Sequence, residues 1–339
     1  MRRDLLILAA ALLALAVSAG IATATAATAA IELRGYSNAT ESDDLPDWEP
    51  KFGVNADLRL YQGELLAQTL DQIEESGANW VRQSVSWAEV ESEPGVFDWS
   101  DWDRLIEPLA SRPNLRLIAV LDQAPAWAVD PSAPDPASAP PSDPAAFARF
   151  ARAFAARYGN IVDFYQVWHE PNLASGWGGL EPRPIEYLAL LAAAYPAIHG
   201  ADTRAQVIAA ALAPTTETGP RNLSDILYLD QLLTLGGAQV MDAAAGQPFG
   251  FNQPPADRTV SPDTLNFSRL ILLRETLVAH GLPTMPLWAS AWGWTSLPAG
   301  WTGDPSIWGA VTSEQQVASS LGALDRAERE WPWLTGLTL

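Results

Sequence analysis

The chain contains no cysteine, only three histidines and few basic residues. Without cysteine, a disulfide scaffold, a thiolate zinc site, an iron–sulfur cluster and a cysteine nucleophile are excluded. Three histidines argue against a His-rich metal site, and we expect neither a metal nor a cofactor. The 20 Lys and Arg against 40 Asp and Glu give a formal net charge of −20. A nucleic-acid backbone would therefore be repelled, and we expect no nucleic-acid partner.

The chain is rich in apolar residues and in tryptophan. Of its 339 residues, 48% are apolar and 18% are charged, which is enough to bury one large core or two smaller ones. The 15 tryptophans are far more than a core needs. A flat indole stacks on a sugar ring while its N–H finds a polar partner, so this excess indicates a carbohydrate substrate or ligand.

The N-terminus is typical of a targeting segment. Arg2 and Arg3 precede an apolar run over 5–17, and small residues over 22–30 offer several cleavage sites of the A-x-A type. We expect residues 1–30 to be a signal peptide or, if uncleaved, an N-terminal membrane anchor. Residues 31–50, rich in Ser, Asp, Glu and Pro, are expected to be an acidic linker. The protein is then secreted or extracytoplasmic, with its folded body at 51–339.

Short β-like runs alternate with amphipathic helical stretches along this folded body. Eight candidate strands occur at residues 52–57, 80–86, 115–121, 162–168, 205–211, 239–244, 286–290 and 336–339. Strands separated by helices form parallel βαβ units, and eight such units predict an α/β fold, a closed (β/α)8 TIM barrel. A doubly wound open sheet is the competing architecture, but no Gly-rich phosphate loop follows the first strand.

The eighth unit is expected to be incomplete at the C-terminus. Residues 336–339 look like a strand without the helix that would follow it. The sequence as it stands then predicts exposed apolar surface between the first and last strands.

In a TIM barrel the chemistry lies at the carboxyl ends of the strands, and the fourth end is the most informative. There Glu170 comes directly after an apolar strand, with Trp168 beside it and Pro171 ending the strand. A carboxyl against an indole in a partly dry cleft has its neutral form favoured, which suits a general acid. The alternative is a solvated glutamate in a strand-ending turn.

The segment around Glu170 resembles a known family. Trp-His-Glu-Pro-Asn at 168–172 is similar to the Trp-Asn-Glu-Pro-Asn motif that ends the fourth strand in glycoside hydrolase clan A, especially in family 39 and family 5 type enzymes. Arg82, Trp87 and the runs 94–99 and 288–294 fit the layout of that clan in the same order. The resemblance extends over 52–339 and implies a TIM-barrel glycosidase.

By this resemblance, Glu170 is the general acid/base and Arg82 orients the nucleophilic carboxylate. His169 stands where the clan has an asparagine that contacts the sugar, and it remains able to donate a hydrogen bond. Asn172 completes the motif as a substrate-binding residue.

Three tryptophans are expected to line the sugar cleft. Trp177 lies in the loop after Glu170, and Trp292 and Trp294 follow the seventh strand. Loops with glycine on both sides are poor places to bury an indole, which favours the cleft over core packing. Trp301 and Trp308 follow in the same stretch.

The chain also departs from the family pattern. Where the clan has a nucleophilic glutamate after the seventh strand, this chain has Ala291, and where a tyrosine contacts that glutamate it has Phe249. An alanine methyl group cannot attack an anomeric carbon, and a retaining mechanism needs two carboxyl groups about 5–5.5 Å apart. Hydrolysis of O-glycosidic bonds by the usual double displacement is therefore in doubt.

Three explanations stay open. An engineered knockout fits poorly with the simultaneous loss of the tyrosine. The protein is otherwise a pseudoenzyme that binds glycans without cutting them, or another carboxylate activates water in an inverting mechanism. The strand-end candidates for that carboxylate are Asp57, Asp122 and Glu217. A weaker alternative is a barrel that serves only as a scaffold for protein contacts.

Overall fold

A computed structural model describes residues 2–35 and 51–339, and each of these two ranges belongs to a separate unit. The first unit is one helix, α1 (Arg2–Glu32). Its segment Ala10–Ile31 is long and apolar enough to cross a membrane, a property that signal sequences share. Most of the expected acidic linker, residues 36–50, lies outside the described residues.

The second unit is built on eight parallel strands. They are β1 (Lys51–Asn55), β2 (Trp80–Ser86), β3 (Arg116–Asp122), β4 (Val162–Val167), β5 (Gln206–Ile208), β6 (Ala244–Gly246), β7 (Leu287–Ala289) and β8 (Leu334–Thr338). Their order is β5-β4-β3-β2-β1-β8-β7-β6, so the first and last strands are neighbours. Isolated parallel bridges from Ile208 to Ala243 and from Leu212 to Gly246 join the two ends of this order. The predicted (β/α)8 barrel is confirmed.

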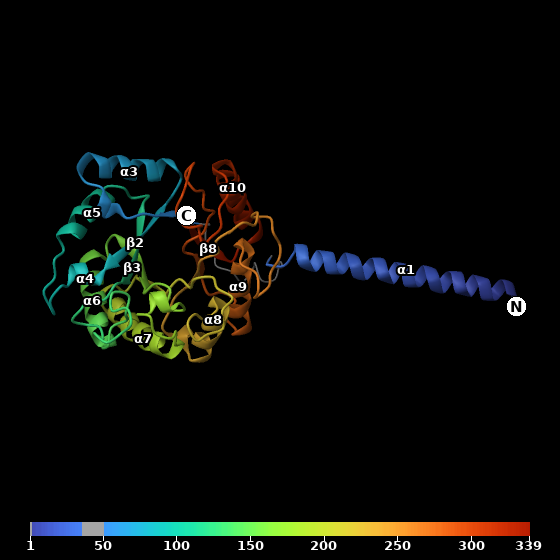
Figure 1. The fold of residues 1–339 in the computed structure, drawn as a ribbon, viewed down its shortest axis with the longest axis horizontal. Coiled ribbons are helices and arrows are strands. Elements are labelled where there is room, and N and C mark those ends of the chain that lie inside the picture. Colours follow the sequence, from blue (N-terminus) through green and yellow to red (C-terminus); the bar gives the residue numbers. More distant parts are fainter. Residues whose placement is uncertain (1, 36–50) are drawn as a thin grey trace. The chain divides into compact units, whose positions relative to one another are not determined.

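Helices follow one another around the ring of strands (Figure 1). They are α3 (Gly63–Glu75), α4 (Trp87–Val90), α5 (Ser100–Ala110), α6 (Pro144–Tyr158), α7 (Pro184–Ala201), α8 (Asp225–Thr234), α9 (Leu270–Ala279) and α10 (Ser313–Glu330). In α6, the Asp143 side chain accepts from the backbone N–H of Ala145, and Phe147, Phe150 and Phe154 form the buried face. The helix therefore begins at its cap and packs through its apolar stripe.

The sixth strand differs from its prediction. The expected strand at 239–244 is largely irregular, and β6 begins only at Ala244, where pairing with Leu287 starts. Gly236, at φ 94°, ends the preceding helix, and Gly237–Gln239 forms a turn of 3-10 helix. The apolar run in the sequence does not mark which of its residues reach the neighbouring strand, and so the prediction was wrong by about five residues.

Large aromatic side chains fill the barrel interior. The rings of Trp80, Phe164 and Trp288 pack edge to face, with centroids 4.9 to 5.9 Å apart. Glycines on two strands make the space: a Cβ at Gly336 would collide with the Trp288 ring, and one at Gly53 would lie 2.8 Å from the Trp80 Cβ. Large aromatic side chains thus pack against glycines on neighbouring strands inside the barrel.

This packing corrects the interpretation of the tryptophan content. Ten of the 15 tryptophans are buried, namely Trp80, Trp87, Trp102, Trp168, Trp177, Trp288, Trp292, Trp294, Trp331 and Trp333. Most of the tryptophan therefore belongs to the core, and its abundance alone does not indicate a sugar cleft.

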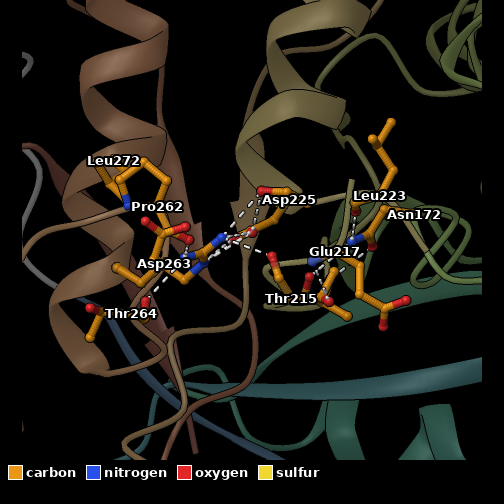
Figure 2. Close-up of polar contacts among 12 residues, drawn as sticks. Asn172, Thr215, Glu217, Leu223, Asp225, Pro262, Asp263, Thr264 and Leu272 are labelled. Carbon is orange, nitrogen blue, oxygen red and sulfur yellow. Dashed lines mark hydrogen bonds and ion pairs between the residues drawn. The ribbon is translucent and has the colours of Figure 1, made fainter. Parts of the chain in front are cut away.

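A buried ion pair ties α8 to the segment that precedes α9. Arg269 donates to both carboxylate oxygens of Asp225, and the two side chains are 1% and 3% exposed. Its remaining N–H groups donate to the carbonyl oxygens of Pro262, Thr264 and Thr215 (Figure 2). Every nitrogen of this guanidinium has an acceptor in the protein, so the pair acts as an internal brace.

An apolar groove of about 620 Å³ runs between the first and last strands and α10. Phe52 and Leu339 lie along it from the two strands, and α10 contributes Val317 and Leu321, which are 59% and 62% exposed.

Candidate active site

A cavity of about 360 Å³ lies at the carboxyl ends of β3 and β4. It is lined by Asp122, Gln123, Ala137, Ser138, Trp168, His169, Glu170, Ser175 and Gly176. This is the end of a (β/α)8 barrel at which active sites form, and the volume falls within the range of small-molecule sites.

Backbone strain is concentrated at this cavity. Four non-glycine residues in the described ranges have positive φ, and three of them line it: Gln123 at 56°, Trp168 at 70° and Glu170 at 48°. Such conformations cost about 1–3 kcal/mol each and persist where the surroundings fix them. Here Trp168 N–H donates to Leu121 O at 2.9 Å, and Glu170 N–H donates to Ala211 O at 3.2 Å. The strand ends are thereby held in one orientation.

Glu170 places its carboxyl in the cavity, with the side chain 26% exposed. Burial raises the pKa of Glu170, while Gln247 and the charge on Arg82 act in the opposite direction. The Gln247 amide nitrogen lies near this carboxyl but forms no hydrogen bond of good geometry with any described acceptor. A carboxyl that tends to keep its proton and faces a cavity is able to act as a general acid.

His169 is neutral and joins Glu170 to Arg82. Burial, followed by the charge on Arg82, lowers the pKa of His169. Its Nδ1 lies 3.4 Å from Arg82 Nη2, and because a guanidinium only donates, Nδ1 is the accepting nitrogen. The proton then sits on Nε2, which is 3.5 Å from Glu170 Oε1.

Arg82, on β2, is a buried cation with neutral contacts. Its Nε donates to Gln166 Oε1 at 2.9 Å, and its Nη1 donates to Asn55 Oδ1 at 2.8 Å. Burial lowers the pKa of Arg82 to about 10, and the charges of Asp122 and Glu170 raise it, so the group is protonated at neutral pH. No described carboxylate is within ion-pair distance of this guanidinium.

The residue at the expected nucleophile position, Ala291, follows β7 at the same mouth. Asn55 Nδ2 donates to the carbonyl oxygen of Ser290 at 3.0 Å, which links the Arg82 contacts to the end of β7. Ser290 N–H donates to Gly246 O at 2.9 Å, one residue before the Gln247 that faces Glu170. The ends of β4, β6 and β7 therefore converge, and the methyl group of Ala291 supplies no charge there.

Asp122, at the end of β3, is a second carboxylate of the cavity. It is 8% exposed and accepts a hydrogen bond from Ser84 Oγ at 2.6 Å. Burial raises the pKa of Asp122 to about 6, against the opposing effects of Ser84 and Arg82.

The other two strand-end carboxylates have different surroundings. Asp57 pairs with Arg59 at 2.9 Å and accepts from Gln83 Nε2 at 3.0 Å, and the Arg59 contact lowers the pKa of Asp57. Glu217 is exposed and accepts from Asn222 at 2.7 Å. Neither lines the Glu170 cavity. No group of three or more His, Asp or Glu within 2–35 and 51–339 is placed to hold a metal ion.

Asn172 does not reach the cavity, contrary to the expectation for a substrate-binding residue. It is 0% exposed, and its amide nitrogen donates to the carbonyl oxygens of Ala213 and Leu223 at 2.8 and 3.0 Å. Its Oδ1 accepts from Ala213 N–H at 2.9 Å. Figure 2 shows Asn172 beside Leu223. Three backbone groups saturate the amide, so the side chain fastens loops together.

The three tryptophans expected in the sugar cleft are buried as well. Trp177 packs edge to face on Trp168 and is 1% exposed. Trp292 and Trp294, 3% and 5% exposed, pack on Phe267 and border the apolar groove rather than the Glu170 cavity. The glycines beside them let the chain fold the indoles inward, so the expectation based on loop composition was wrong.

Three polar residues of the mouth were not among the candidates predicted from the sequence. Gln166, Asn55 and Gln247 lie at or just after strand ends, which is the signal that would have identified them. Trp308 is 43% exposed and lies against Phe249, with ring centroids 5.9 Å apart. It is an exposed indole near the end of β6.

Solved structures with a similar barrel include glycoside hydrolases. A family 39 glycoside hydrolase from Bacteroides cellulosilyticus WH2 superposes with a TM-score of 0.59 at 18% identity, covering 87% of this chain and 58% of that one. A family 39 β-xylosidase from Caulobacter crescentus gives 0.57 at 18% identity, covering 90% and 64%. A psychrophilic family 10 endo-β-1,4-xylanase gives 0.54 at 13% identity, covering 88% of each chain.

These similarities establish the fold. The chain spans about three fifths of the length of the two family 39 structures. No protein-family model and no curated protein sequence matches it. The barrel is thus of the type found in family 39 and family 10 glycoside hydrolases, and the predicted fold is confirmed.

Proposed function

We propose that the protein is glycoside hydrolase-like and acts on O-glycosidic bonds of an extracellular poly- or oligosaccharide, with Glu170 as the general acid. The observation that carries this proposal is the position of Glu170: a largely buried carboxyl with a raised pKa, facing a cavity at the carboxyl ends of the strands. Breaking a glycosidic bond requires a proton on the leaving oxygen, and such a carboxyl supplies it.

Polar groups around Glu170 suit the hydroxyl groups of a sugar. The Gln247 side-chain nitrogen is buried without an acceptor beside Glu170, and such an orphan donor is costly unless a ligand or water pairs with it. His169 presents its Nε2 proton at the same place. Both groups would donate to sugar oxygens. Among the structural neighbours are a β-xylosidase and an endo-β-1,4-xylanase, so β-linked xylose is the first substrate to test.

Ala291 favours one alternative, a non-catalytic glycan-binding protein of the same fold. The position that would hold a nucleophile ends in a methyl group, and Arg82 contacts no carboxylate there. A site of this kind binds a sugar through the same donors but has no group that attacks the anomeric carbon by the retaining route.

Leaving-group dependence in the full-length chain tests the assignment of Glu170. Glu170→Gln should lower kcat by about 100-fold or more on β-xylobiose, whose leaving group needs a proton. It should have little effect on a dinitrophenyl β-xyloside, whose leaving group departs unaided. Glu217→Gln is the matched control, an exposed carboxylate at another strand end, and should behave as wild type. Equal losses on both substrates would refute the role of Glu170 as the acid.

Calorimetric titration with xylo-oligosaccharides separates the two functions. Binding together with product formation supports the hydrolase. Binding without any product, across several sugars and linkages, supports the non-catalytic alternative. Absence of both would refute the carbohydrate function altogether.

The proposal extends to the chain's organisation: residues 1–30 direct the protein out of the cytoplasm as a signal peptide or anchor, 31–50 act as a linker, and 51–339 carry the activity. The long apolar helix α1 supports this arrangement. N-terminal sequencing of the native protein, combined with membrane fractionation, tests it. A mature N-terminus near residues 22–31 indicates cleavage, and an intact chain in the membrane fraction indicates an anchor. An intact chain in the cytosol would refute both.

A further inference from the structure

We infer that Asp122 is the second catalytic carboxylate of this site and that it activates water in an inverting hydrolysis for which Glu170 is the acid. The inference rests on the proposed function and supplies the partner that Ala291 does not. Asp122 and Glu170 line one cavity, from the ends of neighbouring strands.

The register of β3 and β4 brings Asp122 and Glu170 to the same mouth of the barrel. Leu121 pairs with Val167, and Trp168 N–H donates to Leu121 O at 2.9 Å. Asp122 therefore lies beside Trp168, at the end of β4. Beyond it the chain leaves regular strand geometry, since Trp168 and Glu170 have positive φ, and Glu170 N–H donates to the carbonyl oxygen of Ala211. The carboxyl groups of inverting enzymes are about 6.5–9.5 Å apart, which leaves room for the water between them.

Asp122 is also the strand-end carboxylate whose charge no cation contacts. Asp57 is paired with Arg59, and Glu217 is hydrogen-bonded to Asn222 outside the cavity. Among the described residues, Ser84 is the side chain that donates to Asp122, through Oγ to Oδ1 at 2.6 Å. The second carboxylate oxygen, Oδ2, is left able to accept a proton from water in the cavity that Asp122 lines.

A second feature of the mouth is a polar side chain buried beside Glu170. Gln247 is 4% exposed, faces the Glu170 carboxyl from the end of β6, and has a side-chain nitrogen without an acceptor. The neighbouring cavity of about 360 Å³ has space for a sugar ring and a water molecule. A sugar bound there would lie next to both Asp122 and Glu170.

The charges around Asp122 agree with the role of a base at neutral pH. Burial raises the pKa of Asp122 to about 6, Arg82 and Arg59 act to lower it, and Glu89 acts to raise it. Above that pH the carboxylate is ionised and still basic enough to accept a proton. His169, the nearest residue that titrates between pH 5 and 8 in the free state, stays neutral because its pKa is lowered.

The reaction balances without any further reagent. Asp122 removes a proton from water as the water oxygen bonds to the anomeric carbon. The bond from that carbon to the glycosidic oxygen breaks, and Glu170 transfers its proton to the departing oxygen. Asp122 is then protonated and Glu170 ionised, and exchange with solvent resets both. The new hydroxyl group lies on the face opposite the broken bond, so the anomeric configuration inverts.

The test combines product stereochemistry with an Asp122→Asn variant of the full-length chain. Proton NMR during turnover of a β-xyloside should show the α-anomer as the first product. Asp122→Asn keeps the acceptor for Ser84 and should lower kcat by about 100-fold or more, while sugar affinity stays close to wild type. The fall of kcat below about pH 6 in the wild type should disappear in the variant.

A second variant, Asp122→Ala assayed with added azide, tests the role of Asp122 independently of Asp122→Asn. Azide in the vacated space attacks directly, so it should restore turnover and yield a glycosyl azide of inverted configuration. The Glu217→Gln control should keep wild-type kcat and stereochemistry. Retention of configuration, or wild-type kcat in Asp122→Asn, overturns the role of Asp122 and leaves the glycosidase function intact. Sugar binding without turnover in the wild type overturns both the catalytic pairing of Asp122 with Glu170 and the proposed hydrolase function.

Discussion

Two buried arginines of this barrel differ in the charge of their hydrogen-bond partners. Arg269 lies against the Asp225 carboxylate and spends its remaining N–H groups on backbone carbonyls. Arg82 is buried to a similar degree, but its direct partners are the neutral side chains of Gln166, Asn55 and His169. The first charge is neutralised inside the fold, whereas the second is left to act on the mouth of the barrel.

The difference separates structure from chemistry. A buried guanidinium whose charge is paired and whose N–H groups all have acceptors cannot bind a ligand. Its role is structural, because removing it leaves its carboxylate partner buried without a cation. The field of Arg82 instead acts on Asp122 and Glu170, two carboxyl groups whose pKa values burial raises. Incomplete pairing of this kind reduces stability and is common at functional sites.

Removing the matched arginine should give the largest effect. Arg269→Met leaves Asp225 buried without its cation, and loss of one partner of a buried pair costs about 3–5 kcal/mol. Urea unfolding followed by tryptophan fluorescence measures the loss. Arg329→Met, which removes an exposed pair with Asp325, is the control and should change little. A loss no greater than that of the control would break the comparison.

Asp122→Asn should stabilise the fold at neutral pH while it impairs turnover. The pKa of Asp122 is raised from 3.8 to about 6, so the folded state binds this proton more tightly than the unfolded state. The stabilisation that this bound proton gives the folded state is complete below pH 3.8 and is lost as the pH rises through about 6. The raised pKa corresponds to about 3 kcal/mol. Urea unfolding at pH 7.5 should show the variant to be more stable, and at pH 4.5 the difference should be much smaller. A gain that does not depend on pH would contradict this origin.

Asn172→Ala should weaken the fold without weakening sugar binding. The substitution leaves backbone groups of Ala213 and Leu223 buried and unpaired, at a cost of about 1–3 kcal/mol. Thermal unfolding measures that cost, and calorimetric titration with a xylo-oligosaccharide measures affinity. A loss of affinity with normal stability would return Asn172 to the binding site.

Arg82→Met should have the smallest effect on stability and a clear effect on pH dependence. The variant gives up hydrogen bonds to Gln166 and Asn55, worth about 1 kcal/mol each, but also removes the desolvation cost of an unmatched cation. Without the positive charge, the pKa of Asp122 should rise above 6, and the acidic limb of the kcat profile should move to higher pH. An unchanged limb would show that Arg82 does not act on the site.

Much of the fold could be predicted because its signals are local. The caps and apolar faces of the helices are encoded a few residues apart, as in Asp143 and the three phenylalanines of α6. The position of Glu170 could be predicted for the same reason, since an apolar run followed by Glu-Pro indicates the end of a strand. Pairing partners decided the limits of β6, which the sequence misplaced.

Patterns along the chain were enough to predict the alternation of strands and helices, the barrel that it implies, and the group of carboxylates at strand ends. The folded structure was needed to show which of these carboxylates share a cavity and that Arg82 lacks the ion pair that Arg269 has. It also showed that four expected binding residues are buried, namely Asn172, Trp177, Trp292 and Trp294. Periodicity and capping can be predicted because they depend on neighbours in the chain. Burial, pKa and hydrogen-bond saturation depend on neighbours in space, which closure of the barrel brings together from distant parts of the sequence.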